Sequence, residues 1–117
     1  MQKISMLGSG FIGRFYTDSL HGYRNKARVV SIYSRREESA KKFAEDYGVP
    51  HWTTDMEESI SRPEVDVVCI SLPNNLHEEA VHLCCKHNKA VICTKPLGRT
   101  AEEAKRMVEA VEKAGIF

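Results

Sequence analysis

Three glycines near the amino terminus have the spacing of a loop that can hold phosphate groups. They belong to Gly8-Ser9-Gly10-Phe11-Ile12-Gly13, a G-x-G-x-x-G pattern between a short apolar run and residues of helical periodicity. Gly8 permits a tight turn, Gly10 lets a pyrophosphate approach the backbone, and Gly13 lets the helix pack closely on the strand. Free N–H groups of the first helical turn then face the anion. We therefore expect these six residues to bind a dinucleotide; the alternative is a plain glycine-rich turn.

The residues that would meet the adenosine ribose lie about 20 positions beyond the last glycine, where a second strand ends. Here they are Ser34, Arg35 and Arg36. The carboxylate that usually selects NAD is absent, whereas two guanidinium groups suit a 2′-phosphate. This segment favours NADP(H) over NAD(H), and the missing carboxylate also weakens a methyltransferase interpretation. The alternative is that Ser34 to Glu37 form a helix capping box and the arginines are merely solvated.

Alternating strands and helices are needed to position these groups, and the apolar pattern predicts them throughout residues 1–117. We expect strands over 4–7, 29–33, 51–52, 65–70 and 90–93, and helices over 11–20, 36–47, 54–62, 76–87 and 100–115. Parallel strands require crossover connections of this kind, which are right-handed. The predicted fold class is α/β, a single Rossmann-type domain with a doubly wound parallel sheet.

In combination, several segments make the sequence resemble the glucose–fructose oxidoreductase / inositol dehydrogenase (Gfo/Idh/MocA) family. They are the glycine loop, Phe43 to Pro50, Arg62 to Val68, Ser71 to His77, and Thr94 to Leu97. The resemblance spans essentially the whole chain and corresponds to the family's N-terminal NAD(P)-binding domain. It implies an NAD(P)-dependent dehydrogenase or reductase acting on a sugar, polyol or related small molecule. In the family a mixed α/β domain follows, and we expect this chain, which ends on the apolar pair Ile116-Phe117, to be a fragment of such an enzyme.

The resemblance also implies a catalytic lysine and a second cofactor-binding segment. The family's Glu-Lys-Pro motif falls on Thr94-Lys95-Pro96, which makes Lys95 the candidate that touches the reacting hydroxyl beside the nicotinamide. Thr94 replaces the family's glutamate. The alternative for Lys95 is a surface lysine before a turn proline. The further residues implied to contact the cofactor are Ser71, Leu72, Pro73, Asn74, Asn75, His77, Thr94, Lys95 and Pro96.

The segment after the fourth strand also has a purely local interpretation. Asn75 is a good helix N-cap with Glu78 near the third helical position, and His77 could simply pack in the first helical turn. The two interpretations are compatible, since the same residues could serve both purposes.

Composition narrows the remaining function classes. The formal net charge of +1 gives no field that would recruit nucleic acid or an anionic membrane. The N-terminus lacks the apolar stretch of a signal peptide, so we expect a cytoplasmic protein. The four cysteines form no C-x-x-C pair and no metal is expected. The resemblance implies a homo-oligomer for the full-length protein, and the second hypothesis for its function is a non-catalytic nucleotide-sensing module.

Overall fold

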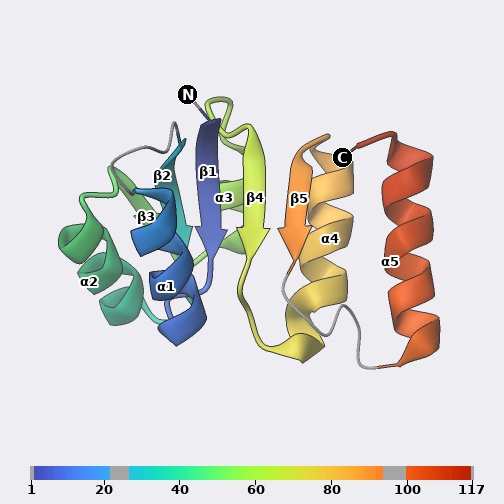
Figure 1. Ribbon diagram of the computed structural model, residues 1–117, viewed down its shortest axis with the longest axis horizontal. Helices are drawn as coiled ribbons and strands as arrows, with labels where there is room; N and C mark the ends of the chain where they lie inside the picture. The colour runs from blue at the N-terminus through green and yellow to red at the C-terminus, as the bar shows by residue number, and fades with distance from the viewer. Residues whose placement is uncertain (1, 22–26, 94–99, 117) are drawn as a thin grey trace.

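The computed structural model describes residues 2–21, 27–93 and 100–116, in which strands and helices alternate as expected (Figure 1). The strands are β1 (Gln2–Leu7), β2 (Ala27–Tyr33), β3 (His51–Thr53), β4 (Val67–Ile70) and β5 (Ala90–Cys93). The helices are α1 (Phe11–Leu20), α2 (Glu37–Tyr47), α3 (Met56–Ser61), α4 (His77–Lys86) and α5 (Ala101–Ala114), with a 3-10 turn, η1, over Asn74–Leu76. No helix in these ranges is both long and apolar enough to cross a membrane.

The described strands form one parallel sheet in the order β3-β2-β1-β4-β5, which confirms the predicted Rossmann-type fold. The chain moves from β1 to β2 and β3 on one side, and then crosses to β4 and β5 on the other. The order therefore reverses between β1 and β4, and such a switch point opens a crevice at the carboxyl ends of the strands. In Figure 1 these ends lie at the arrowheads, where the chain leaves β1 towards α1 and leaves β4 towards α4.

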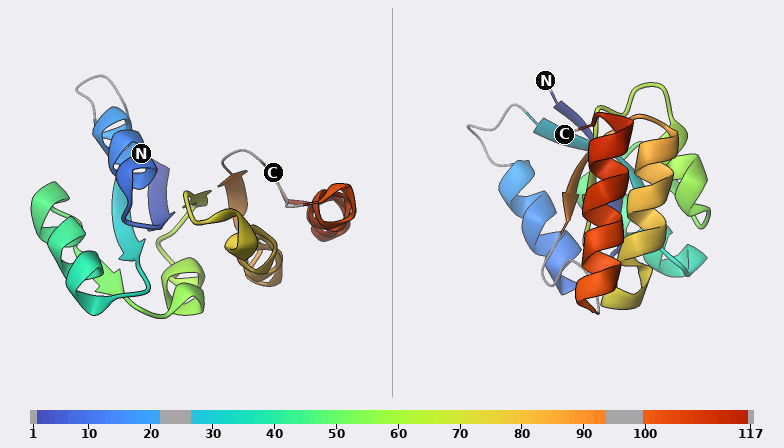
Figure 2. Two further views of the ribbon diagram at one scale, coloured as in Figure 1. Left: turned by 90° about the horizontal axis from the view of Figure 1, so that it is seen from below. Right: turned by 90° about the vertical axis from the view of Figure 1, so that its right-hand side faces the viewer.

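Two apolar clusters pack on opposite faces of the sheet. On one face Ile4, Met6 and Cys69 pack with Phe43 of α2, and the half-buried Tyr16 of α1 joins them. On the other face α3, α4 and α5 contribute Ile60, Val81, Cys84 and Met107. Figure 2 shows α1 on the side of the sheet opposite to α3 and α4. Because both faces are covered, the central strands are almost continuously apolar, as parallel strands usually are.

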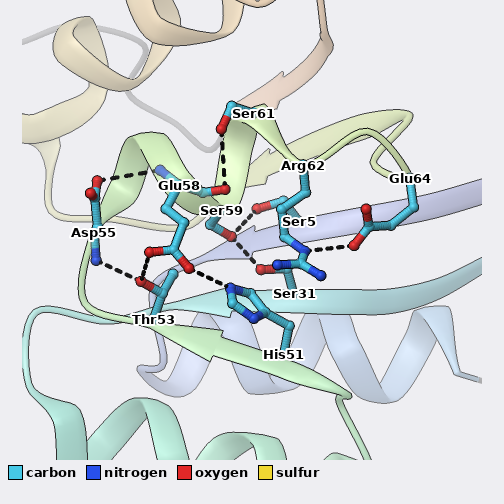
Figure 3. Close-up of polar contacts among 10 residues, drawn as sticks. All are labelled: Ser5, Ser31, His51, Thr53, Asp55, Glu58, Ser59, Ser61, Arg62 and Glu64. Atoms are coloured by element: carbon cyan, nitrogen blue, oxygen red, sulfur yellow. Dashed lines mark hydrogen bonds and ion pairs between the residues drawn. The ribbon is translucent and has the colours of Figure 1, made fainter.

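A chain of buried hydroxyl groups fastens α3 to the sheet (Figure 3). Ser59 of α3 lies between Ser5 of β1 and Ser31 of β2, with Oγ–Oγ distances of 2.6 and 2.7 Å. All three residues are fully buried. A hydroxyl can donate once and accept twice, so Ser59 satisfies both neighbours without any water. Since buried polar groups need partners, this chain fixes the position of α3.

Two element starts differ from the prediction for reasons that the contacts make clear. Strand β4 begins at Val67 rather than Val65, because the Val65 N–H donates to the Arg62 carbonyl and the Lys89 ammonium donates to the Val65 carbonyl. Helix α3 is capped by Asp55, one residue after the expected Thr54; its carboxylate accepts from the Glu58 N–H at 3.3 Å. Helices α2 and α5 keep their expected ends, with Gly48 and Gly115 in the left-handed conformation at their C-caps.

Candidate functional site

The protein itself requires two of the three loop glycines. Gly8 has φ +108°, and a Cβ there would lie 2.8 Å from the carbonyl oxygen of Ser71. At Gly13 a Cβ would overlap the carbonyl oxygen of Gly8 and approach the Ser71 hydroxyl to 2.9 Å. The loop also hydrogen-bonds to β2, because the Gly8 N–H donates to the Tyr33 carbonyl at 2.8 Å. These contacts hold the start of α1 tightly against the ends of β1 and β4.

Gly10 is different, because no atom of the described residues lies within 4 Å of the position a Cβ would take. Its carbonyl accepts the first helical hydrogen bond of α1, from the Arg14 N–H at 3.0 Å. Neither packing nor a positive φ therefore demands glycine here. The open space lies directly in front of a helix N-terminus, where backbone N–H groups attract anions. This is the cradle that the pyrophosphate of a dinucleotide requires.

A cavity of about 600 Å³ opens at this cradle and continues past the end of β2. Its walls are Gly8, Ser9, Gly10, Tyr33, Ser34, Arg35, Arg36, Ser39, Ser71, Leu72, Pro73 and Leu76. The structure thus brings the glycine loop, the Ser34–Arg36 segment and the start of the Ser71–His77 segment into one site. Tyr33, Ser39 and Leu76 are additions that the sequence pattern did not identify. Tyr33, the last residue of β2, and Ser39, in the first turn of α2, flank the Ser34–Arg36 segment on either side.

The capping-box alternative for Ser34 is wrong. The N-cap of α2 is Arg36, which makes no side-chain capping bond. The Ser34 hydroxyl instead hydrogen-bonds to that of Ser9 at 2.9 Å, so it joins the Ser34–Arg36 segment to the glycine loop. Ser34 is buried by this contact, whereas Arg35 and Arg36 remain exposed at the cavity wall.

The cavity carries a one-sided charge. Two guanidinium groups, of Arg35 and Arg36, line it, and no Asp or Glu does. Across residues 2–21, 27–93 and 100–116, neither arginine forms an ion pair. Such a wall suits a ligand with several negative charges, and a guanidinium can hold a phosphate through paired hydrogen bonds.

The turn after β4 is hydrogen-bonded to the end of β1, directly before the glycine loop. The Ser71 hydroxyl donates to the Leu7 carbonyl at 2.9 Å, and the Ser71 N–H donates to the same oxygen at 2.9 Å. Leu72, Pro73 and Leu76 give the cavity an apolar wall. Asn75 lies in the 3-10 turn and is exposed, while the N-cap of α4 is Leu76, without a side-chain bond. The expectation that Asn75 caps α4 is therefore wrong.

His77 lies beneath this turn and not on the cavity wall. It is 1% exposed, with Nε2 at 2.9 Å from the Leu72 carbonyl oxygen and Nδ1 at 3.5 Å from Cys93 Sγ. A carbonyl oxygen can only accept, so Nε2 carries the proton and Nδ1 accepts from the thiol. Burial raises the pKa of Cys93 to about 11, which keeps that thiol protonated. The imidazole thus joins the turn after β4 to the end of β5.

Six of the expected site residues have little or no side-chain description. Thr94, Lys95 and Pro96 lie outside the described residues, and the description resumes at Thr100. Cys93, which precedes them, is the last residue of β5, so it lies at the carboxyl ends of the strands, as the glycine loop does. Phe11 and Ile12 form the first turn of α1, and Asn74 begins η1. Among the described residues, no group of His, Cys, Asp or Glu side chains is arranged to hold a metal ion.

Comparison with known proteins gives this geometry a context. Residues 2–117 match the model of an oxidoreductase family with an NAD-binding Rossmann fold. A 1,5-anhydro-D-fructose reductase of Ensifer adhaerens is 38% identical over 88 residues, which cover 75% of this chain and 26% of that protein. An NADP(+)-dependent scyllo-inositol 2-dehydrogenase of Bacillus subtilis is 28% identical over 116 residues, covering 99% of this chain and 35% of that protein.

A solved structure shows the same arrangement. The crystal structure of an NAD-binding oxidoreductase from Klebsiella pneumoniae superposes with a TM-score of 0.89 at 27% identity, over 98% of this chain and 32% of that one. The chain therefore spans about a third of the length of the proteins it matches.

Proposed function

Because the chain belongs to this oxidoreductase family with an NAD-binding Rossmann fold, we propose that it holds NADP(H) in the cavity at the glycine loop. We propose further that the whole protein transfers hydride between this cofactor and a sugar, polyol or related alcohol or carbonyl compound. The open space at Gly10 carries the proposal, because it leaves room for a pyrophosphate in front of the N-terminus of α1. The enzymes named among its relatives favour this function over a non-catalytic sensing module or a methyltransferase.

Preference for NADP(H) is supported by the charge of the cavity wall. An adenosine ribose reaching Ser34 would place its 2′-phosphate beside Arg35 and Arg36. No lining carboxylate is present to accept from the 2′- and 3′-hydroxyls of NAD(H) or to repel the extra phosphate. One relative that the chain matches over nearly its full length is named for NADP(+).

Equilibrium titration with NADPH and NADH tests this preference. We expect NADPH to bind more tightly, and Arg35→Ala to remove about ten- to hundredfold of that affinity, the value of a charge-assisted hydrogen bond to phosphate. Lys41→Ala is the matched control, since it removes an equal charge from an exposed position of α2 outside the cavity. Equal affinity of the wild-type chain for both cofactors, or an equal loss in the two variants, would refute NADP(H) selectivity.

The chemistry of the site is hydride transfer, which a bound nicotinamide supplies. The proposed part of Lys95 is to orient the substrate hydroxyl and to offset the negative charge that develops on its oxygen as the hydride leaves. The support is its position in the sequence, two residues after β5 at the carboxyl edge of the sheet. Thr94, in place of the family's glutamate, leaves this loop without a carboxylate for the nicotinamide ribose.

Lys95→Met in the whole protein tests that part. We expect kcat to fall by about a hundredfold or more while the Kd for NADPH changes little, since the lost charge acts mainly in the transition state. Unchanged turnover would show that Lys95 does not act on the substrate.

The proteins matched here are about three times longer than this chain, which supports the proposal that a second domain supplies the proton-transfer residues and the substrate pocket. Homo-oligomerisation and a cytoplasmic location are further proposals for that whole protein.

A further inference from the structure

A second recess adjoins the cofactor cavity. It has a volume of about 420 Å³ and lies between the turn after β3 and helix α4. Its walls are Tyr33, Thr54, Asp55, Met56, Glu57, Leu76, Glu79 and Leu83. Two of these residues, Tyr33 and Leu76, also line the cofactor cavity, so the two spaces meet at them. A ligand that fills the first cavity can therefore reach the second.

The two spaces carry opposite charge. Of the residues that the structure describes, three carboxylates and no cationic side chain line the second recess, whereas two guanidinium groups and no carboxylate line the first. Glu57 is occupied by Lys86 at 2.7 Å and His87 at 2.8 Å, and Asp55 caps α3. Within the described part of the chain, Glu79 forms no hydrogen bond and no ion pair. Glu79 is therefore the carboxylate that remains for a ligand.

Tyr33, which lines the recess, carries a hydroxyl group that a ligand could contact. The residue is 8% exposed and packs in the apolar cluster with Met56 and Leu76. Its hydroxyl makes no hydrogen bond to any described residue and is not itself a buried atom, so it is accessible where the two spaces meet. Burial first and the Glu79 carboxylate second raise its pKa, so the hydroxyl stays protonated. The recess therefore has a hydroxyl and an unpaired carboxylate among its walls.

We propose that Tyr33 and Glu79 recognise the amino edge of the adenine base of the cofactor. In this arrangement the 6-amino group donates to the Glu79 carboxylate, a neighbouring ring nitrogen accepts from the Tyr33 hydroxyl, and the ring lies against Leu76. The base is bound to the ribose that Ser34 would contact, and Tyr33 directly precedes Ser34. The inference rests on the proposed cofactor site and adds a reason for that site to select adenine over a base with an oxygen at position 6.

Such a base reverses the hydrogen-bonding pattern. Hypoxanthine carries a carbonyl oxygen at position 6, which only accepts, and an N–H at the adjacent ring position, which donates. The oxygen would face the Glu79 carboxylate, so two acceptors would meet without a proton between them. The Tyr33 hydroxyl can rotate to accept from the N–H, so the discrimination falls on Glu79. A site built to pair with a substrate amino group rejects the analogue that lacks it, because the carboxylate is left without its donor.

The experiment compares NADPH with its deamino analogue, nicotinamide hypoxanthine dinucleotide phosphate, in equilibrium titrations. We expect the wild-type chain to bind the analogue about ten- to hundredfold more weakly. Glu79→Gln should weaken NADPH and strengthen the analogue, since the glutamine amide can donate to the carbonyl oxygen. Tyr33→Phe should weaken NADPH by a smaller factor. Glu38→Gln, an exposed acid of α2 outside both spaces, is the matched control and should leave the ratio unchanged.

The outcomes separate this inference from the proposed function. If NADPH binds and the wild-type chain holds the analogue equally well, the recess does not read the base, while the cofactor site stands. If the wild-type chain discriminates but Glu79→Gln keeps the full ratio, the assignment of Glu79 is overturned. If neither dinucleotide binds, the proposed function fails together with the inference. Glu79 is exposed, so its substitution tests the proposal even if Tyr33→Phe lowers the stability of the fold.

Discussion

Single residues of the glycine loop have separable roles. Gly8 and Gly13 face the backbone and hydroxyl of Ser71, whereas Gly10 faces open space. The fold thus requires glycine at two positions of the motif, and the proposed pyrophosphate site accounts for the third. A pair of alanine substitutions distinguishes the two.

We expect Gly13→Ala to lower the free energy of unfolding by about 2 kcal/mol or more, because the new methyl group overlaps the Gly8 carbonyl oxygen in a closely packed turn. Gly10→Ala should cost at most about 1 kcal/mol, the value of a helix N-cap preference. It should nevertheless weaken NADPH, since the methyl group occupies the space proposed for the pyrophosphate. Urea unfolding and NADPH titration measure the two effects. A strongly destabilised Gly10→Ala variant with intact NADPH affinity would contradict the assignment.

At the scale of elements, α3 depends on one hydroxyl in its interior. Ser59→Ala leaves Ser5 and Ser31 buried without their shared partner. We expect a loss of about 1–3 kcal/mol in the free energy of unfolding, the cost of unsatisfied buried polar groups. Ser61→Ala is the control on the same helix, since its hydroxyl makes only a 3.4 Å contact with the Glu58 carbonyl near the surface. Similar stability of the two variants, measured in urea, would show that the hydroxyl chain is dispensable.

Helices α4 and α5 are joined by a pair of charge-assisted hydrogen bonds. Arg106 donates to both oxygens of Glu78, at 2.7 and 3.0 Å, and lowers the pKa of that carboxyl from 4.5 to about 2, with His82 as a smaller cause. A depressed folded-state pKa adds stability above pH 4.5, and this contribution disappears as the pH falls from 4.5 to 2. Glu78→Gln should therefore flatten the dependence of stability on pH within that window. Salt should weaken the wild-type effect, because the pair is near the surface.

A denaturant series between pH 2 and 5 checks this expectation, with Glu38→Gln as the control at an exposed position of α2. An identical pH slope in the wild type and in Glu78→Gln would mean that the pair does not contribute in solution.

The type and order of the described elements followed from local sequence alone, because apolar periodicity and turn glycines act over a few residues. Some element starts did not follow from local sequence, because groups distant in the chain determine them. The Lys89 ammonium binds the Val65 carbonyl, and the Ser34 hydroxyl bonds to Ser9 and does not cap α2. Asn75 lies in a 3-10 turn and therefore does not cap α4. The glycine loop and Ser34–Arg36 were predicted as site residues from fixed spacings, and both line one cavity. That Tyr33 and Glu79 line one recess was not predicted, because it arises only when β2 and α4 pack together.

At the scale of the whole molecule, the crevice is electrically divided although the formal net charge is only +1. The side of β2 and α2 presents Arg35 and Arg36, and the neighbouring recess presents Asp55, Glu57 and Glu79. A dinucleotide phosphate has a matching division, with anionic phosphates at one end of the adenosine and a hydrogen-donating amino group at the other. In the proposed complex, the distribution of charge, and not its total, therefore orients the ligand.

The hydrogen bonds from Ser71 to the Leu7 carbonyl, at the end of β1, also have a consequence for how fast the proposed cofactor site forms during folding. Ser71 and Leu7 are 64 residues apart in the chain, and β1 pairs with β4 across a similar separation. Contacts between such distant segments form late, because loop-closure entropy opposes them. In a stopped-flow refolding experiment, far-ultraviolet circular dichroism should recover first, and the ability to bind NADPH should return only with the slowest phase. The dinucleotide would then report the completion of folding, since helix α1 alone cannot hold it.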